Sequence, residues 1–249
     1  MKINITDKPL SVFLSAADDT TRQLLATQPV GVKLVQEVDD FIRLRLYGED
    51  VQLDPVPAVL AINSYYSFLG ATRVALSGQL VAVFPLIRHC LECACYAYLM
   101  TEKPELNQVW SDRHNGSDEL RSCRKAFGSA VADVALSIKA KQEQLGSLID
   151  DIYQASIDFG AHPNAKSIFP HISLSDVEEG TEVSLACLYG EHDIRCQQGL
   201  IACGETGIAS MFVTALATNN HSLLDEKLTA MDEIYSRVHV AITELKATS

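Results

Sequence analysis

Several signatures of familiar enzyme classes are absent from the sequence. It contains no Gly-x-Ser-x-Gly nucleophile elbow, no His-Glu-x-x-His metalloprotease helix and no glycine-rich loop followed by Lys-Ser or Lys-Thr. These absences exclude serine hydrolases, zincins and P-loop nucleotide-binding proteins in their ordinary forms. The sequence therefore predicts no cofactor and assigns no catalytic residue.

Basic residues are also scarce. The 249 residues include 20 Lys and Arg against 32 Asp and Glu, which gives a formal net charge of −12. Such a charge repels phosphate backbones and argues against bulk DNA or non-specific RNA binding. Because 47% of the residues are hydrophobic, the chain has enough apolar surface to bury a substantial core. These numbers indicate an acidic globular protein.

Neither a secretory signal nor a membrane span is predicted. Met1–Asp7 lacks the basic stretch and apolar run of a signal peptide. The longest uncharged stretch, 206–224, has about a dozen apolar residues before two asparagines, whereas a helical span needs about 20. Seven cysteines, an odd number, are typical of reduced, mostly buried thiols rather than of a disulfide framework. We expect a cytoplasmic protein with no membrane partner.

Helical periodicity dominates the chain. Apolar residues recur at spacings of three and four, and Asp54-Pro55 suits a helix start because proline fits the first helical turn. Pro85 interrupts the most hydrophobic segment and should kink that helix or divide it in two. A connector is expected at 101–115. Helices are expected at 16–26, around 35–46, from Pro55 to Leu76, over 80–100, and as one long helix from about 120 to Phe159.

In residues 181–196, apolar and polar residues alternate instead of following the helical period. Residues 181–189 alternate apolar with smaller or polar side chains, Gly190-Glu191 resembles a turn, and alternation resumes to Cys196. This predicts a β-hairpin near residues 181–196, followed by helices at 199–218 and 222–246. With no repeat or composition break to mark a boundary, residues 1–249 read as a single, mainly α domain: a helical bundle with a small β-hairpin insert.

Two opposite charges stand on the most apolar predicted helix. Arg88 and Glu92 are four residues apart, so they share one helical face and should form a pair. A buried ion pair is a poor source of stability, so its presence calls for a reason such as a polar pocket. The alternatives are a structural ion pair to a neighbouring helix, or a position at the solvent edge of this helix.

His162 stands where the long predicted helix should end, directly before Pro163. An imidazole there can bind the last helical carbonyls, which is a capping role. Alternatively, His162 could serve as an acid, a base or a polar contact in a cleft if Tyr153 or Asp158 orients it.

We predict that six polar or amphipathic side chains share one cleft, because buried charges and imidazoles persist mainly where they satisfy one another or a ligand. An arginine beside a glutamate, with an imidazole and an indole wall, suits a small anionic or planar ligand better than a long nucleic acid. The six candidates are Arg88, Glu92, Trp110, Arg113, Tyr153 and His162.

Cysteine and histidine cluster twice without a convincing metal site. His89 and Cys93 have the four-residue helical spacing that lets two ligands share a metal. The second group surrounds the predicted hairpin and lacks a recognised zinc spacing. Since free cysteine often behaves as a small buried hydrophobe, we predict packing and no metal at either group. The second group comprises Cys187, His192, Cys196 and Cys203.

Three short motifs within residues 57–170 carry a family resemblance. They are Arg88-x-x-x-Glu92, Trp110-x-x-Arg113 and the helix end from Ser156 to His-Pro-Asn at 162–164. With them the chain resembles uncharacterised bacterial helical proteins distantly allied with the HEPN and abortive-infection group.

HEPN ribonucleases carry Arg-x(4–6)-His near a helix end, gathered at a dimer interface where the pair activates a ribose hydroxyl and binds phosphate. Here no arginine lies four to six positions before His162; Ser156 or Ile157 holds that place. The resemblance therefore implies a helical homodimer more directly than it implies a nuclease.

Three functional hypotheses follow. The first is a helical protein that acts by interaction or small-ligand binding as a homodimer, formed through one of its long helices. The second is a HEPN-like ribonuclease or toxin-type protein, acting on RNA with a rearranged site that uses Arg88, Glu92, Arg113 and His162. The third is a metal-dependent enzyme that uses the cysteine and histidine groups.

Overall fold

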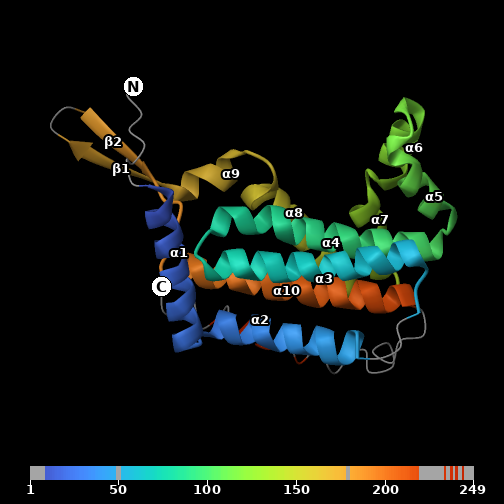
Figure 1. Cartoon of the computed structure of the whole chain (residues 1–249), viewed down its shortest axis with the longest axis horizontal. Helices are drawn as coiled ribbons and strands as arrows, with labels where there is room; N and C mark the ends of the chain where they lie inside the picture. Colours follow the sequence, from blue (N-terminus) through green and yellow to red (C-terminus); the bar gives the residue numbers. More distant parts are fainter. Residues whose placement is uncertain are drawn as a thin grey trace.

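The computed structural model describes residues 9–48, 52–177 and 180–218, together with single residues between 233 and 243. The chain is mainly α-helical with one small β-hairpin, as its periodicity predicts (Figure 1). The α-helices are α1 (Leu10–Thr27), α2 (Val30–Phe41), α3 (Pro55–Leu76), α4 (Leu80–Glu102), α5 (Glu105–Ser111), α6 (Ser117–Phe127), α7 (Ala130–Lys139), α8 (Glu143–Ser156), α9 (Ala165–Ile168) and α10 (Ile194–Thr218). The strands are β1 (Ile172–Val177) and β2 (Gly180–Leu185).

The core is formed where α4 and α10 pack against each other, with α3 against both, α2 against α10, and α8 against α4 (Figure 1). Glycines on α10 permit this close packing. A Cβ atom at Gly207 would lie 2.8 Å from Val38 and 2.9 Å from Phe68, and one at Gly204 would lie 2.8 Å from Leu34. The α10 backbone therefore lies directly against α2 and α3.

Helix α4 is continuous through Pro85 and is not divided in two. Proline lacks the N–H that would otherwise bond to the carbonyl of Val81. That carbonyl instead faces the turn after α8, where a Cβ atom at Gly160 would lie only 2.8 Å from it. The rings of Phe84 and Phe159 pack 5.6 Å apart beside this contact. The end of α8 is thereby held against the first half of α4.

The prediction of a single long helix from about 120 to Phe159 is wrong. Its apolar positions are buried, but the chain breaks into α6, α7 and α8, and α7 packs back against α8. Gly128 and Ser129 separate α6 from α7. The turn between α7 and α8 is tight, since a Cβ atom at Gly146 would lie 2.5 Å from the Cα atom of Lys139. The connector expected at 101–115 also contains a helix, α5.

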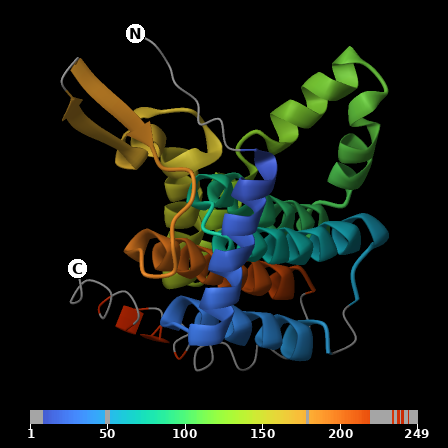
Figure 2. The same cartoon turned by 60° about the vertical axis from the view of Figure 1, so that its left-hand side comes forward.

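The hairpin lies earlier in the chain than expected. Strand β2 falls in the predicted region, but its partner is β1, paired antiparallel with Leu174 opposite Val183. The predicted second strand is instead the start of α10, because the Asp193 carboxylate accepts from the backbone N–H of Arg195 at 2.9 Å and caps that helix. The hairpin projects away from the bundle (Figure 2). Most of the helix expected at 222–246 lies outside the described residues.

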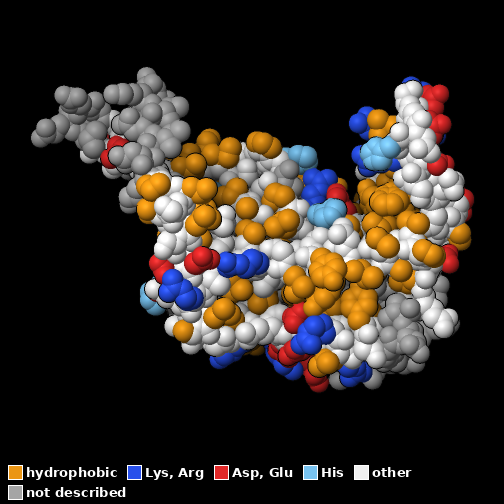
Figure 3. All heavy atoms as spheres, in the orientation of Figure 1, with side chains coloured by type: hydrophobic (Ala, Val, Ile, Leu, Met, Phe, Trp, Pro, Cys, Tyr) orange, Lys and Arg blue, Asp and Glu red, His pale blue; other side chains and the backbone are white. Residues whose placement is uncertain are grey.

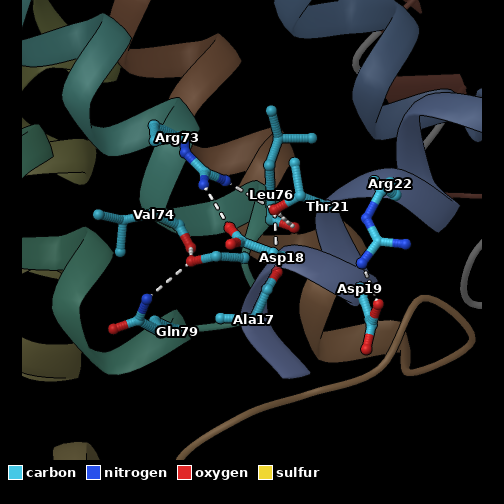
Figure 4. A network of polar contacts seen from close by, with 10 residues as sticks. Ala17, Asp18, Asp19, Thr21, Arg22, Arg73, Val74, Leu76 and Gln79 are labelled. Atoms are coloured by element: carbon cyan, nitrogen blue, oxygen red, sulfur yellow. Dashed lines mark hydrogen bonds and ion pairs between the residues drawn. The ribbon is translucent and has the colours of Figure 1, made fainter. Parts of the chain in front are cut away.

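Helix α1 is attached to the C-terminal part of α3 by a polar network (Figure 4). Arg73 donates to Thr21 at 2.7 Å and to Asp18 at 2.9 Å, and the Thr21 hydroxyl donates to the carbonyl of Leu76 at 3.2 Å. The Arg73–Asp18 ion pair is exposed, so it contributes only about 0–1 kcal/mol. The network therefore positions α1 against α3 but adds little to the free energy of unfolding.

Among the described residues, α4 and α10 are long and apolar enough to cross a membrane. Within the fold, 83% of the apolar 18-residue stretch of α10 is buried, and 44% of the corresponding stretch of α4 is buried. Core helices of soluble proteins have the same length and composition, so these helices are weak evidence for a membrane span. The prediction of no membrane partner stays a prediction.

Candidate functional site

Four of the six predicted site residues meet at one arginine. The Nε atom of Arg88 donates to Glu92 at 2.8 Å, Nη1 lies 2.9 Å from Nε2 of His162, and Nη2 donates to the Tyr153 hydroxyl at 3.2 Å. The guanidinium also lies over the Tyr153 ring, 5.2 Å from its centroid. Arg88, Glu92, Tyr153 and His162 are called the Arg88 site below.

Two helices and one loop bring these groups together. Arg88 and Glu92 share a face of α4, and Tyr153 lies in the last turn of α8. His162 follows the π-helical turn Ile157–Ala161 and has an extended backbone. The Asn164 side chain donates to the carbonyl of His162 at 3.0 Å and also caps α9. These contacts fix the backbone that carries the His162 imidazole.

Arg88 remains charged in this setting. Burial lowers the pKa of Arg88, whereas the hydrogen bond and charge of Glu92, together with Tyr153, raise it by more. The pKa of Arg88 therefore lies above its ordinary value. The side chains of Arg88 and Glu92 are only 22% and 27% exposed. Their ion pair is therefore shielded from water more than an exposed pair such as Arg73–Asp18.

The guanidinium also determines the hydrogen-bonding state of His162. Since a guanidinium can only donate, Nε2 of His162 must accept, and a neutral ring then carries its hydrogen on Nδ1. Arg88 has five N–H bonds, and the three contacts use one on each nitrogen. With respect to the described residues, one N–H on each terminal nitrogen is therefore left for a further acceptor.

Trp110 and Arg113 lie outside this direct contact. Trp110 is half-buried on α5 and packs against the core, and Arg113 lies in the 3-10 turn that follows. Among the described residues, no hydrogen bond or ion pair joins either of them to the Arg88 site. Burial and then Glu92 raise the pKa of Tyr96 to about 12, while Arg113 lowers it. The Nε atom of Arg113 is buried without a hydrogen-bond partner.

The molecular surface is hollowed on the face shown in Figure 3. Figure 3 shows histidine, basic and acidic side chains gathered over α4 and α8, next to a hollow that separates the body of the molecule from α5 and α6. Four of the six residues predicted to share one cleft are therefore in direct contact, Trp110 and Arg113 lie on α5 and in the turn after it, and the shared cleft stays a prediction.

A neighbouring polar group was missed by sequence reasoning. Asn63 of α3 lies 3.0 Å from the exposed ring of His89 and donates to the sulfur of Cys93 at 3.2 Å. Cys90 and Cys93 form a Cys-x-x-Cys sequence on α4 that the sequence reasoning also overlooked. Burial raises the pKa of Cys90 and raises that of Cys93 to about 11, so both thiols keep their protons at neutral pH.

The second cysteine and histidine group is dispersed. Cys187 is exposed in the loop after β2, whereas Cys196 and Cys203 are buried on α10. Over the parts of the chain that the structure describes, no three His, Cys, Asp or Glu side chains are arranged to hold a metal ion.

No protein-family model, curated protein or solved structure matches this chain. The resemblance to the HEPN group therefore stays a prediction, and functional proposals rest on the geometry of the chain's own residues.

Proposed function

We propose that this protein binds a small anionic ligand at the Arg88 site. The observation that carries the proposal is the half-buried guanidinium of Arg88, oriented by Glu92, Tyr153 and His162, with one N–H free on each terminal nitrogen. A planar guanidinium held in one orientation suits bidentate recognition of a carboxylate or phosphate. Because its orienting contacts are already made, little side-chain entropy is lost on binding.

The surroundings favour a small ligand over a nucleic acid. Glu92 neutralises part of the charge of Arg88, and the whole chain carries a net charge of −12, so a long polyanion would be repelled outside the site. The Nδ1–H of a neutral His162 would supply one more donor, and the predicted shared cleft would add the half-buried Trp110 of α5 as an aromatic surface. These groups fit a ligand with one anionic group and a planar ring.

Isothermal titration calorimetry with adenosine monophosphate tests the proposal, with inorganic phosphate and adenosine as separate arms. The wild-type protein should bind adenosine monophosphate more tightly than either fragment. Arg88→Ala should weaken binding at least about 30-fold, because a charge-assisted bidentate contact is lost. Arg121→Ala, which changes an exposed arginine on α6, is the matched control and should leave the affinity unchanged.

Two outcomes of the calorimetry would contradict the proposal. Equal affinities for the wild type and Arg88→Ala would place any binding elsewhere on the molecule. Equal loss in Arg88→Ala and Arg121→Ala would show that binding reflects only general charge. Either result contradicts the proposal.

RNA cleavage is a second candidate, favoured by the contact between Arg88 and His162. If Arg88 moved from Nε2 of His162 to a phosphate, Nε2 would be free to accept the proton of a ribose 2′-hydroxyl as the 2′ oxygen attacks phosphorus. The P–O5′ bond would break in the same step, giving a 2′,3′-cyclic phosphate and a 5′-hydroxyl whose proton comes from water. Incubation with single-stranded RNA tests this candidate. Cleavage by the wild type that disappears in an Arg88→Ala/His162→Ala double mutant would support it, and intact RNA would reject it.

A further inference from the structure

Helix α3 presents an apolar face to solvent. Between Pro55 and Leu76 its only charged residue is Arg73. The inward face packs on α4 and α10, yet Val59, Ile62 and Tyr66 are 62%, 46% and 63% exposed. A helix that is apolar on every side is ordinarily covered on every side. The outward face of α3 is therefore suited to burial against a partner.

The exposed residues are spaced like an interhelical seam. Val59, Ile62, Tyr66 and the half-buried Leu69 follow one another at intervals of three, four and three residues. This alternation of three and four places side chains along one line of contact between two helices. The four residues are called the α3 seam below. Figure 3 shows the corresponding apolar patch over α3, on the same side of the molecule as the charged group over α4 and α8.

We propose that the α3 seam binds a second copy of this chain, with the two α3 helices antiparallel across a twofold axis. With the axis near Ser64, Ile62 faces Tyr66 of the second copy. Val59 then faces Leu69 of the second copy, so every seam position meets an apolar side chain. Such an interface is self-complementary, as a twofold interface must be.

Charge determines both the partner and the direction. Two copies that each carry a charge of −12 repel one another, so they can approach best along an element without acidic residues, and α3 itself contains none. In the antiparallel arrangement the exposed Asp54, just before α3, comes near Arg73 of the second copy. A parallel arrangement would instead place the two Arg73 side chains against each other.

The area agrees with a dimer core of modest size. With large side chains of about 150–250 Å² each, the exposed parts of Val59, Ile62 and Tyr66 supply about 300 Å² per copy. A standard interface buries about 800 Å² per partner, of which the centre is apolar and the rim polar. The remainder would come from flanking polar groups, which include His89 with Asn63 on one side and Arg73 with Asp18 at one end.

Sedimentation-velocity ultracentrifugation of the full chain over a range of concentrations tests the proposal. The wild type should dimerise, and Ile62→Glu should weaken the dimer at least about 100-fold, since a charge would be buried against Tyr66 of the second copy. Leu136→Glu is the matched control, because Leu136 is 72% exposed on α7, away from the seam, and this variant should dimerise like the wild type. Equal melting temperatures at a concentration too low for either variant to dimerise would show that both are folded.

Cross-linking then tests the direction. In a Cys187→Ser background, which removes the exposed cysteine, Ile62→Cys and Tyr66→Cys proteins mixed under mild oxidation should form a disulfide-linked heterodimer faster than either forms a linked homodimer. A monomeric wild type, a dimer unaffected by Ile62→Glu, equal loss in Leu136→Glu, or faster homodimer linkage would each overturn the proposal. Retained binding of adenosine monophosphate by Ile62→Glu would show that this result is independent of the Arg88 site.

Discussion

Arg88 is a charged residue in an otherwise apolar helix, and its environment explains how that is tolerated. The carboxylate of Glu92, the hydroxyl of Tyr153 and the imidazole of His162 each accept one of its N–H groups, so the partly buried guanidinium has partners on all three nitrogens. The same contacts hold the side chain in one orientation. Stability and ligand binding therefore make opposite demands on Glu92, which stabilises the charge and also neutralises it.

This opposition leads to a prediction for Glu92→Gln. The amide keeps the size of the side chain but removes its negative charge, so the free energy of unfolding should fall by about 1–2 kcal/mol. The affinity for adenosine monophosphate should rise by about 3-fold to 10-fold, because Arg88 is no longer neutralised by a neighbour. Urea denaturation and calorimetry measure the two effects. A lower affinity together with lower stability would contradict this account of Glu92.

Glu205 on α10 provides a separate prediction about pH. Burial, and secondarily the charge of Asp151 on α8, raise the pKa of Glu205 from 4.5 to about 7. The folded protein thus holds this proton where the unfolded chain has lost it, and the resulting stability is present at low pH and is lost as the pH rises from about 4.5 through 7.

Glu205→Gln should accordingly raise the free energy of unfolding by about 1–2 kcal/mol at pH 8 and change it little at pH 5. Urea denaturation of the wild type and the variant at both pH values measures the difference. Asp133→Asn, on the exposed side of α7, is a control that should change stability little at either pH. A Glu205→Gln effect of equal size at both pH values would contradict the role of ionisation.

At the scale of elements, starts and faces of helices could be predicted better than turns. The Asp54-Pro55 signal located the start of α3, and a helix around 35–46 was predicted from spacing alone, in a segment where Val35 and Val38 are buried on α2. The breaks on either side of α7 were missed because the apolar positions keep the same spacing across them. β1 was missed although Ile172 and Leu174 alternate with serines, since the preceding Pro163 and Asn164 suggested a loop.

The glycines of the helical core lead to a matched pair of substitutions. Gly207→Ala should lower the free energy of unfolding by about 1–3 kcal/mol, because the added Cβ would lie within 2.9 Å of Val38 and Phe68. Gly70→Ala, on α3, should instead raise it by about 0.5–1 kcal/mol, because no atom lies within 4 Å of the added Cβ and alanine favours helix. Urea denaturation of both variants checks this, and similar effects of the same sign would contradict the packing of α10.

At the scale of the whole molecule, part of the site could be predicted from the sequence. The pairing of Arg88 with Glu92 follows from helical spacing, and the convergence with Tyr153 and His162 follows from the rule that polar groups near a core satisfy one another. The distance of Trp110 and Arg113 from these contacts could not be predicted, because it depends on where α5 and the following turn leave the bundle. Asn63 was missed because it is a lone polar residue with no motif around it.

The most direct test of the account is arginine side-chain NMR of the full chain during titration with adenosine monophosphate. The Nε–H resonance of Arg88, assigned by its loss in Arg88→Lys, should shift progressively and saturate with the same dissociation constant that calorimetry gives. The ring resonances of His162 should shift with it, since Nε2 of His162 lies 2.9 Å from the same guanidinium. Unchanged Arg88 and His162 resonances at a concentration of adenosine monophosphate that saturates the calorimetric signal would contradict the central claim that the Arg88 site binds the anion.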